Sequence, residues 1–266
     1  MKKTLKRTFK RNSHASFFKS LAGFGRSLNR FYENRNHDVY SNGEFSILKK
    51  LSQLNPKLII DGGANIGKYS KLTQEACPGV KVYAFEPVPA TFDLLSENVK
   101  SYQSVVPVKK GLFKEEGDLE INLYSSNTHS SIVDIQGLSY ESTGKTTIEL
   151  VKGDDFFKKE GVDSIDLLKL DLEGVELDAL YGFGEMLDQG KIRMIQFEYG
   201  YINITTKHLL IDFYKFFESK GYVLGKIFPK TVEFREYKFK YEDFLGPNFI
   251  AVRKDDTELI NLLKSK

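Results

Sequence analysis

The segment LIIDGGANIGKYS at residues 58–70 determines the predicted fold. A short apolar run ends at Asp61, a glycine-rich turn follows, and residues 68–76 have the pattern of a helix. Glycines let a chain turn sharply and leave bare peptide for a ligand to approach. The free amides at the start of the next helix favour a carboxylate. The segment therefore predicts a strand, a ligand-binding turn and a helix.

Strands and helices alternate on both sides of this segment. Predicted strands lie at residues 57–60, 80–85, 105–108, 119–124, 147–151, 165–170, 191–197, 222–227 and 249–252, and predicted helices at 68–76, 92–99, 154–159 and 207–219. A polar stretch at residues 125–145 is predicted to be a loop. This alternation is typical of βαβ units, and it predicts an α/β domain with a mostly parallel sheet and helices on both faces.

Composition and charge limit the class of protein and its partners. Hydrophobic residues make up 41% and charged residues 28% of the 266-residue chain, as in ordinary soluble proteins. A single cysteine, Cys77, excludes an internal disulfide and fits a reducing compartment. We therefore expect a cytoplasmic location.

The first 35 residues form a basic arm, which we separate from an α/β body at residues 36–266. The arm holds ten Lys or Arg against one acid, whereas the body holds 29 basic and 35 acidic residues. Five apolar residues of the arm recur at helical spacing: Phe17, Leu21, Phe24, Leu28 and Phe31. Three interpretations stay open: a solvated, partly disordered tail, a helix docked on the body or another subunit, and a helix in peripheral contact with the inner membrane surface.

Glu86 narrows the ligand expected at the glycine turn. It ends the second predicted strand, 25 residues after Asp61, where a carboxylate can accept hydrogen bonds from both hydroxyls of a ribose. The dinucleotide pattern G-x-G-x-x-G fails here, because Ala64 or Asn65 stands at its second glycine. A phosphate-binding P-loop fails at this turn too, because no G-K-[ST] follows its glycine after a four-residue spacer. A nucleoside with an amino-acid end and no pyrophosphate fits best, and S-adenosylmethionine has that chemistry.

Four segments resemble the FkbM family of S-adenosylmethionine-dependent methyltransferases. They are LIIDGGANIGKYS at 58–70, VYAFEPVPATFDLLSENV at 82–99, IDLLKLDLEGVELDALYG at 165–182 and IQFEYG at 195–200. The resemblance covers about residues 56–200 and implies O-methylation, often of sugars and secondary metabolites. It also implies a Rossmann-like methyltransferase fold, with a seven-stranded sheet whose last strand is antiparallel.

The same resemblance implies roles for residues around the turn. Glu86 would bind the ribose hydroxyls, and Pro87, Gly111 and Leu112 would lie at the adenine. The methionine end would be bound by the turn itself: Asp61, Gly62, Gly63, Ala64, Asn65 and Gly67. Gly62 departs from the pattern, since the family is expected to have a hydrophobic residue such as Val at that position.

Acidic residues gather at the strand ends next to this turn. Asp171, Glu173 and Glu176 follow the strand at 165–170, and Glu198 ends the neighbouring strand. Such a cluster fits an acid–base site, a hard-cation site for an ion such as Mg²⁺, or acids that complement a helix dipole. We expect Asp171 and Glu198 to be catalytic, with Lys169 paired to one of the acids.

A histidine in the polar stretch is the other catalytic candidate. Histidine is a residue type that can act as a base near neutral pH, and His129 lies in a predicted loop over the sheet edge. The working hypothesis is an O-methyltransferase for a small hydroxylated acceptor, such as a sugar. Nucleic acid is not the expected partner. The alternatives are a nicotinamide-dependent oxidoreductase and a nucleic-acid-binding or scaffold protein that uses the arm, and the sequence leaves the oligomeric state open.

Overall fold

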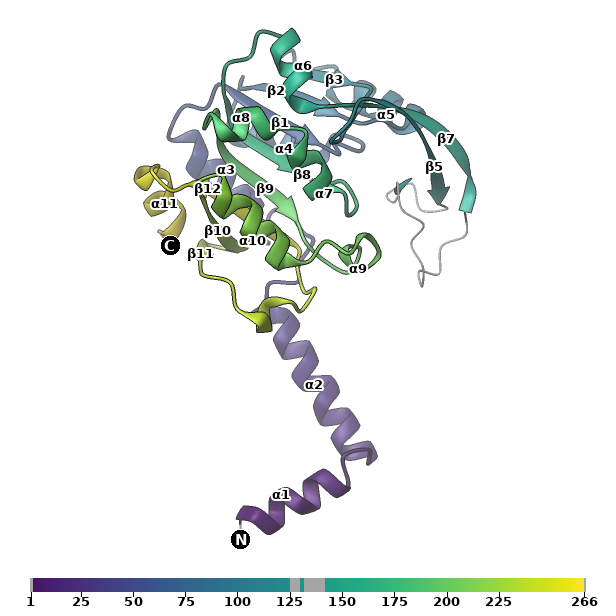
Figure 1. The fold of residues 1–266 in the computed structure, drawn as a ribbon, viewed down its shortest axis with the longest axis vertical. Helices are drawn as coiled ribbons and strands as arrows, with labels where there is room; N and C mark the ends of the chain where they lie inside the picture. The colour runs from purple at the N-terminus through teal and green to yellow at the C-terminus, as the bar shows by residue number, and fades with distance from the viewer. Residues whose placement is uncertain (1, 125–129, 132–141, 266) are drawn as a thin grey trace.

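An eight-stranded sheet forms the centre of the protein, whose computed structural model describes residues 2–124, 130–131 and 142–265. The strand order is β11-β10-β12-β9-β8-β1-β2-β3 (Figure 1). The strands are β1 (Leu58–Gly62), β2 (Lys81–Phe85), β3 (Val105–Val108), β8 (Ile165–Leu170), β9 (Ile192–Glu198), β10 (Tyr222–Phe228), β11 (Thr231–Phe234) and β12 (Asn248–Arg253). The five strands from β9 to β3 are parallel to one another. The predicted mostly parallel α/β sheet is confirmed.

The antiparallel end of the sheet differs from the prediction in one strand. β12 runs antiparallel to both β9 and β10, so the expected antiparallel last strand is confirmed. The expected number of seven strands is wrong, because β11 pairs with β10 as an eighth strand at the edge. The four residues of this strand alternate polar and apolar side chains, a signal that the sequence analysis did not assign to a strand.

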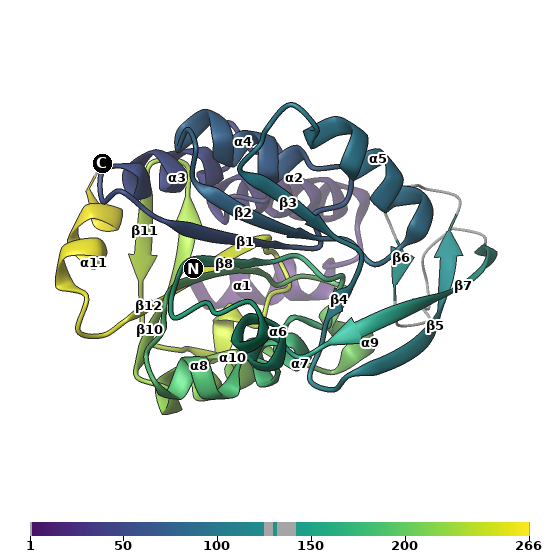
Figure 2. The same ribbon diagram turned by 90° about the horizontal axis from the view of Figure 1, so that it is seen from above.

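Helices cover both faces of the sheet (Figure 2). They are α3 (Glu44–Ser52), α4 (Lys68–Ala76), α5 (Pro89–Val99), α6 (Gly153–Lys159), α7 (Glu176–Tyr181), α8 (Gly184–Asp188), α9 (Asn203–Thr206), α10 (Leu210–Ser219) and α11 (Thr257–Lys264), with a 3-10 helix η1 (Phe239–Tyr241). α3, α4 and α5 lie on one face, and α6, α7, α8 and α10 on the other. Successive residues of β1 enter different cores: Leu58 and Ile60 pack with the α6–α10 side, Ile59 with the α3–α5 side. Because both faces of β1 are buried, its sequence begins with a continuous apolar run.

A second sheet of four strands extends beyond the carboxyl edge of the first. Its order is β4-β7-β5-β6, with β4 (Gly111–Leu112), β5 (Gly117–Tyr124), β6 (Ser130–Ser131) and β7 (Ser142–Val151). β5 and β7 form a long antiparallel ribbon that projects from the body (Figure 1). The predicted strands at 119–124 and 147–151 lie within this ribbon, although β7 begins at Ser142, inside the stretch predicted to be a loop.

The basic arm consists of two helices that project away from the body (Figure 1). α1 (Lys2–Arg11) precedes α2 (Ser16–Tyr32), the helix that the apolar spacing predicts. Docking of α2 on the body is wrong, because α2, which is fully described, contains no buried residue. Across the described residues, no helix is both long and apolar enough to span a membrane.

The junction between arm and body is firmly built. Glu33, which directly follows α2, pairs with the buried Lys226 of β10 at 2.7 Å between Oε2 and Nζ. The side-chain amide of Asn34 donates to the carbonyl oxygens of Asn42 and Ile227, at 2.7 and 3.0 Å. These contacts fix the point from which the arm leaves the sheet.

Candidate active site

The first βα turn has a conformation that excludes larger side chains. Gly63, Asn65 and Gly67 have φ values of 75°, 51° and 84°. A Cβ atom on Gly63 would lie 1.9 Å from the carbonyl oxygen of Asp171. The amides of Gly63 and Ala64 donate to the carbonyl oxygen of Phe85, at 3.1 and 2.8 Å. The turn is therefore wedged between the ends of β2 and β8, and its peptide groups are left bare.

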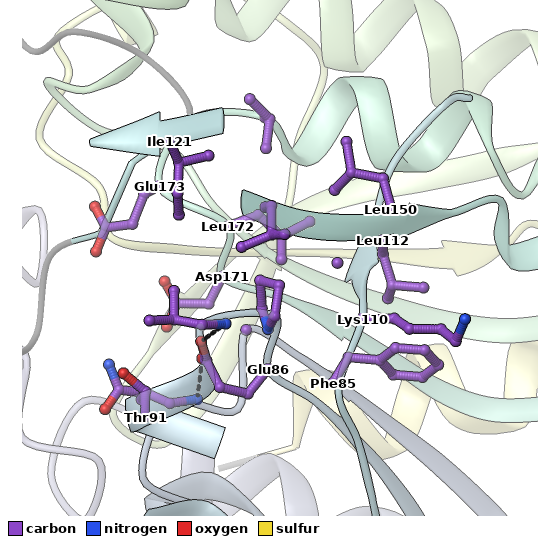
Figure 3. A pocket seen from close by; sticks show the side chains of 17 residues that line it. Phe85, Glu86, Thr91, Lys110, Leu112, Ile121, Leu150, Asp171, Leu172 and Glu173 are labelled. Atoms are coloured by element: carbon purple, nitrogen blue, oxygen red, sulfur yellow. Dashed lines mark hydrogen bonds between the residues drawn. The ribbon is translucent and has the colours of Figure 1, made fainter. Parts of the chain in front are cut away.

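Glu86 lies at the end of β2 and is buried against this turn. Its Oε2 accepts the amide of Asn65 at 3.1 Å, and its Oε1 accepts the amide of Val88 at 2.9 Å (Figure 3). Burial raises the pKa of Glu86 to about 7, against the lowering effect of these two hydrogen bonds. Each carboxylate oxygen can accept more than one hydrogen bond. Glu86 can therefore still bind two hydroxyl groups.

A cavity of about 850 Å³, counting the space open to solvent, lies in front of Glu86. We call it the first cavity. Phe85, Leu112 and Leu150 form an apolar side of the cavity. Glu173 lies at the opposite margin, and its carboxylate points away from the cavity (Figure 3). Ile121 of β5 also lines it, so the second sheet helps to enclose the cavity. Its lining, apolar with a few polar groups, is typical of a small-molecule site.

The residues expected to bind the cofactor divide into two groups, apart from Ala64, which lines only the second cavity described below. Those that line the first cavity are Gly63, Asn65, Glu86, Pro87, Gly111 and Leu112. Asp61, Gly62 and Gly67, all within the described part of the chain, line neither this cavity nor the second one described below. Asp61 is fully buried and accepts a hydrogen bond from Ser70 Oγ at 2.7 Å, so it supports the turn from behind.

A second cavity adjoins the first and contains the predicted catalytic acids. Ala64, Asp171 and Glu198 line it, and Gly63, Asn65 and Asp171 line both cavities. Lys169 also lines it, together with residues to which the sequence analysis gave no role in the site: His37, Val39, Asn42, Glu44, Ile66, Lys68, Tyr69, Pro247 and Asn248. Two ligands bound in the two cavities would meet at Asp171.

Lys169 links the acids beneath the second cavity, as the sequence analysis predicted. Its Nζ lies 3.3 Å from Asp61 Oδ1 and 3.2 Å from Asp171 Oδ2. Burial alone would lower the pKa of Lys169, but the charges of Asp171, Asp61 and Glu44 raise it above its usual value. Lys169 thus stays charged and holds a fixed positive charge next to Asp171.

Asp171 and Glu198 share a hydrogen bond and titrate as a pair. Burial opposes ionisation of Asp171, but Lys169 and the hydrogen bond from Glu198 hold its pKa below the usual value. Burial and the neighbouring charge of Asp171 raise the pKa of Glu198 well above its usual value. The directions of these two pKa shifts make Asp171 the ionised member of the pair and Glu198 the member that donates to it, which leaves Asp171 as a proton acceptor in the second cavity.

Glu176 has a structural position. It begins α7 and is fully buried, and its Oε1 accepts the amides of Leu172 and Gly174 at 2.8 and 3.2 Å. Burial raises the pKa of Glu176 to about 8. It thus closes the loop that follows β8 and carries Asp171.

Two other expectations find no counterpart in the described residues. His129, the third catalytic candidate, lies outside them. Within residues 2–124, 130–131 and 142–265, no group of three or more His, Cys, Asp or Glu side chains is arranged to hold a metal ion. Of the acidic residues that the sequence places at these strand ends, Asp171 forms an ion pair with Lys169 and a hydrogen bond with Glu198.

Comparisons with known proteins identify relatives of this chain. A methyltransferase, sdnD, from Sordaria araneosa is 31% identical over 156 residues, which is 48% of this chain and 60% of that protein. The hexuronic acid methyltransferase AglP from Haloferax volcanii is 28% identical over 144 residues, 53% of this chain and 55% of that protein. The chain thus matches little more than half the length of these relatives.

A solved structure and a family profile complete the comparison. The crystal structure of methyltransferase FkbM from Methylobacillus flagellatus KT aligns with a TM-score of 0.48 and 17% identity, over 74% of this chain and 43% of that one. The profile of the Methyltransferase FkbM domain matches residues 61–224, which is more than half of the chain and includes the turn, Glu86, Asp171 and Glu198. The chain belongs to the FkbM methyltransferase family.

Proposed function

We propose that this protein transfers the methyl group of S-adenosylmethionine to a hydroxyl of a sugar or another small acceptor. The observation that carries the proposal is the junction of the two cavities at Asp171. One cavity presents a carboxylate suited to a ribose, and the other presents an ionised carboxylate suited to removing a proton from a hydroxyl. The name of the relative AglP, a hexuronic acid methyltransferase, supports a sugar-like acceptor.

The donor groups of the first cavity fit the proposed cofactor. Glu86 keeps acceptor capacity for two ribose hydroxyls, and Leu112 and Leu150 provide an apolar surface for a purine ring. The side chain of Gly63 is restricted to hydrogen, which leaves peptide groups accessible where the first cavity meets the second. A pyrophosphate would instead lie near the buried acids, which favours the sulfonium ligand over NAD.

When bound, S-adenosylmethionine supplies an electrophilic methyl group. Asp171 would accept the proton of the acceptor hydroxyl as the oxygen–methyl bond forms, and Glu198 and Lys169 would hold Asp171 in its ionised state and orientation. The enclosure of both reactants aligns them and excludes water, which accounts for much of the acceleration in a displacement of this kind.

Replacement of Asp171 by Asn tests this assignment. We expect Asp171→Asn to lower kcat by about a hundredfold or more, because general-base catalysis is lost, and to leave S-adenosylmethionine binding unchanged. The assay is transfer of a labelled methyl group to free hexoses and hexuronic acids, with mass identification of the product. Asp93→Asn, at an exposed position on α5, is the matched control. Full activity of Asp171→Asn would remove Asp171 from the mechanism, and addition of a chelator or of Mg²⁺ tests whether a metal assists.

We place this reaction in the cytoplasm and, through the basic arm, at the inner surface of the membrane. The single cysteine supports a reducing compartment, and the uncovered apolar face of α2 supports peripheral contact.

A further inference from the structure

Helix α2 carries two opposite faces, and neither is covered by the body. At 3.6 residues per turn, the five apolar residues that recur at helical spacing fall within an arc of about 80°, whereas Lys19, Arg26 and Arg30 fall on the far side. The apolar residues are largely exposed: Phe17 68%, Leu21 54%, Phe24 62%, Leu28 52% and Phe31 84%. A helix with Phe and Leu on one face and basic residues on the other is typical of helices that lie in a membrane interface.

The stability of α2 argues that this face is covered when the protein works. Gly23 and Gly25 each weaken a helix by about 1 kcal/mol relative to alanine. Helices of this length draw most of their stability from burial of an apolar face. All of α2 is described, and none of its residues is buried. The missing burial must come from a partner.

Helix α1 extends the same surface and adds charge. Phe9 contacts Phe18 edge-to-face, with ring centroids 5.3 Å apart, so the two helices meet through aromatic side chains. The exposed Lys6 and Lys10 lie on either side of Phe9 in the sequence. The one acid of the arm, Glu33, is already paired with Lys226. The free charges of the arm are therefore all positive, which opposes the pairing of two arms and favours an anionic surface.

The segment that directly follows the arm lines the second cavity. Arg35 stacks on Tyr201 with its guanidinium carbon 4.8 Å from the ring centroid, and Glu33 and Asn34 are bonded to β10. Only a few residues later, His37, Val39 and Asn42 form part of the cavity wall. A surface bound by α2 would thus be connected to the second cavity through this short segment.

We propose that α1 and α2 bind an anionic lipid bilayer, with the apolar face of α2 inserted between headgroups, and thereby hold the second cavity next to the membrane surface. The partner is anionic phospholipid. This inference rests on the proposed function only in calling that cavity the acceptor site, since binding to lipid requires no methyl transfer.

Fluorescence gives a direct test, because the chain contains no tryptophan. Phe24→Trp introduces a single fluorophore on the apolar face, and Leu94→Trp, on α5 and 51% exposed, is the matched control. With vesicles of phosphatidylcholine and phosphatidylglycerol, we expect the emission of the Phe24→Trp protein to move to shorter wavelength and that of the control to stay unchanged. Unchanged emission of the Phe24→Trp protein would overturn the proposal.

Sedimentation with vesicles tests the two faces separately. The full-length protein should sediment with the anionic vesicles, less so at high salt, and hardly with phosphatidylcholine alone. Lys19→Glu/Arg26→Glu/Arg30→Glu should bind at least about tenfold more weakly, as should Phe17→Ser/Phe24→Ser/Phe31→Ser. Reversal of three exposed body lysines, Lys100, Lys158 and Lys254, is the matched charge control and should change little.

The other outcomes are distinguishable. If the triple Phe→Ser variant binds vesicles as the wild type does, the proposal is overturned in favour of bulk electrostatic attraction. If the wild type is a dimer in sedimentation velocity and this variant is not, the proposal is overturned in favour of a second copy of the chain as the partner. S-adenosylmethionine binding is measured on the same samples. Its absence together with intact vesicle binding would contradict the proposed function and leave this inference standing.

Discussion

At the scale of single residues, the ionisation of Glu86 controls the first cavity. Burial raises the pKa of Glu86 to about 7. Ribose hydroxyls donate to the ionised carboxylate, so ligand binding lowers the pKa of Glu86. The affinity for the ligand is therefore full above the pKa of the free protein and is lost as the pH falls below it. We therefore expect the Kd for S-adenosylmethionine to rise by up to about tenfold for each pH unit below about 7.

Calorimetry at several pH values measures this dependence. Glu86→Gln should bind S-adenosylmethionine more weakly and without the pH dependence, since the amide does not titrate in this range. A wild-type affinity that stays constant on both sides of neutrality would show that Glu86 does not bind the ribose.

A second residue-scale prediction concerns the charge beside Asp171. Lys169 lowers the pKa of Asp171, so Lys169→Met should raise that pKa and move the acidic limb of the kcat profile to higher pH. Lys68→Met, a change at an exposed lysine that lines the same cavity, should leave the profile in place. An unshifted profile in Lys169→Met would mean that this ion pair does not set the ionisation of the base.

At the scale of elements, Glu176 determines the conformation of the loop between β8 and α7. Glu176→Ala removes the acceptor of two amides and should lower the free energy of unfolding by about 2 kcal/mol. Glu176→Gln keeps an acceptor oxygen and should cost less than about 1 kcal/mol near neutral pH. Urea unfolding measures both, and equal losses in the two variants would contradict this role.

The pH dependence of Glu176 supplies a check with a defined sign. Because the folded pKa is raised to about 8, the native state binds this proton more tightly than the unfolded chain does. Its contribution to stability is therefore full in acid and is lost as the pH rises to about 8. Glu176→Gln should lack this loss and gain stability relative to the wild type above that pH.

The elements that the sequence predicts well are those with a local signal. Helix α4 is predicted to the residue, since the glycine turn marks its start and Pro78-Gly79 follow its end. Helix α3 was not predicted, because it begins after Gly43 at a φ of 108° with no side-chain cap. The first half of β7 is polar and pairs with β5 alone, so it leaves no pattern of burial in the sequence.

In the candidate site, too, the sequence predicts some residues and misses others. Gly63, Glu86, Asp171 and Glu198 meet as predicted, because the carboxyl ends of parallel strands share one edge of the sheet. Asn42 and Tyr69 were not connected with the site. The segment before α3 reaches the second cavity only through tertiary contacts, such as the bond of Asn34 to β10, which no local pattern encodes.

At the scale of the whole molecule, the Lys226–Glu33 pair joins arm and body. Lys226→Met leaves Glu33 largely buried without its partner and should lower the free energy of unfolding by about 3 kcal/mol. Adding Glu33→Leu should restore most of that loss, because a buried ion pair is replaceable by apolar residues when both partners change. A double variant as unstable as the single one in urea unfolding would show that the pair is not coupled.

The most direct test of the central claim is calorimetric titration of the full-length protein with S-adenosylmethionine and, separately, with NAD. The first cavity predicts binding of one S-adenosylmethionine per chain, no binding of NAD, and loss of S-adenosylmethionine binding in Glu86→Ala. Binding of NAD without S-adenosylmethionine, or S-adenosylmethionine binding that is unchanged in Glu86→Ala, would contradict the account.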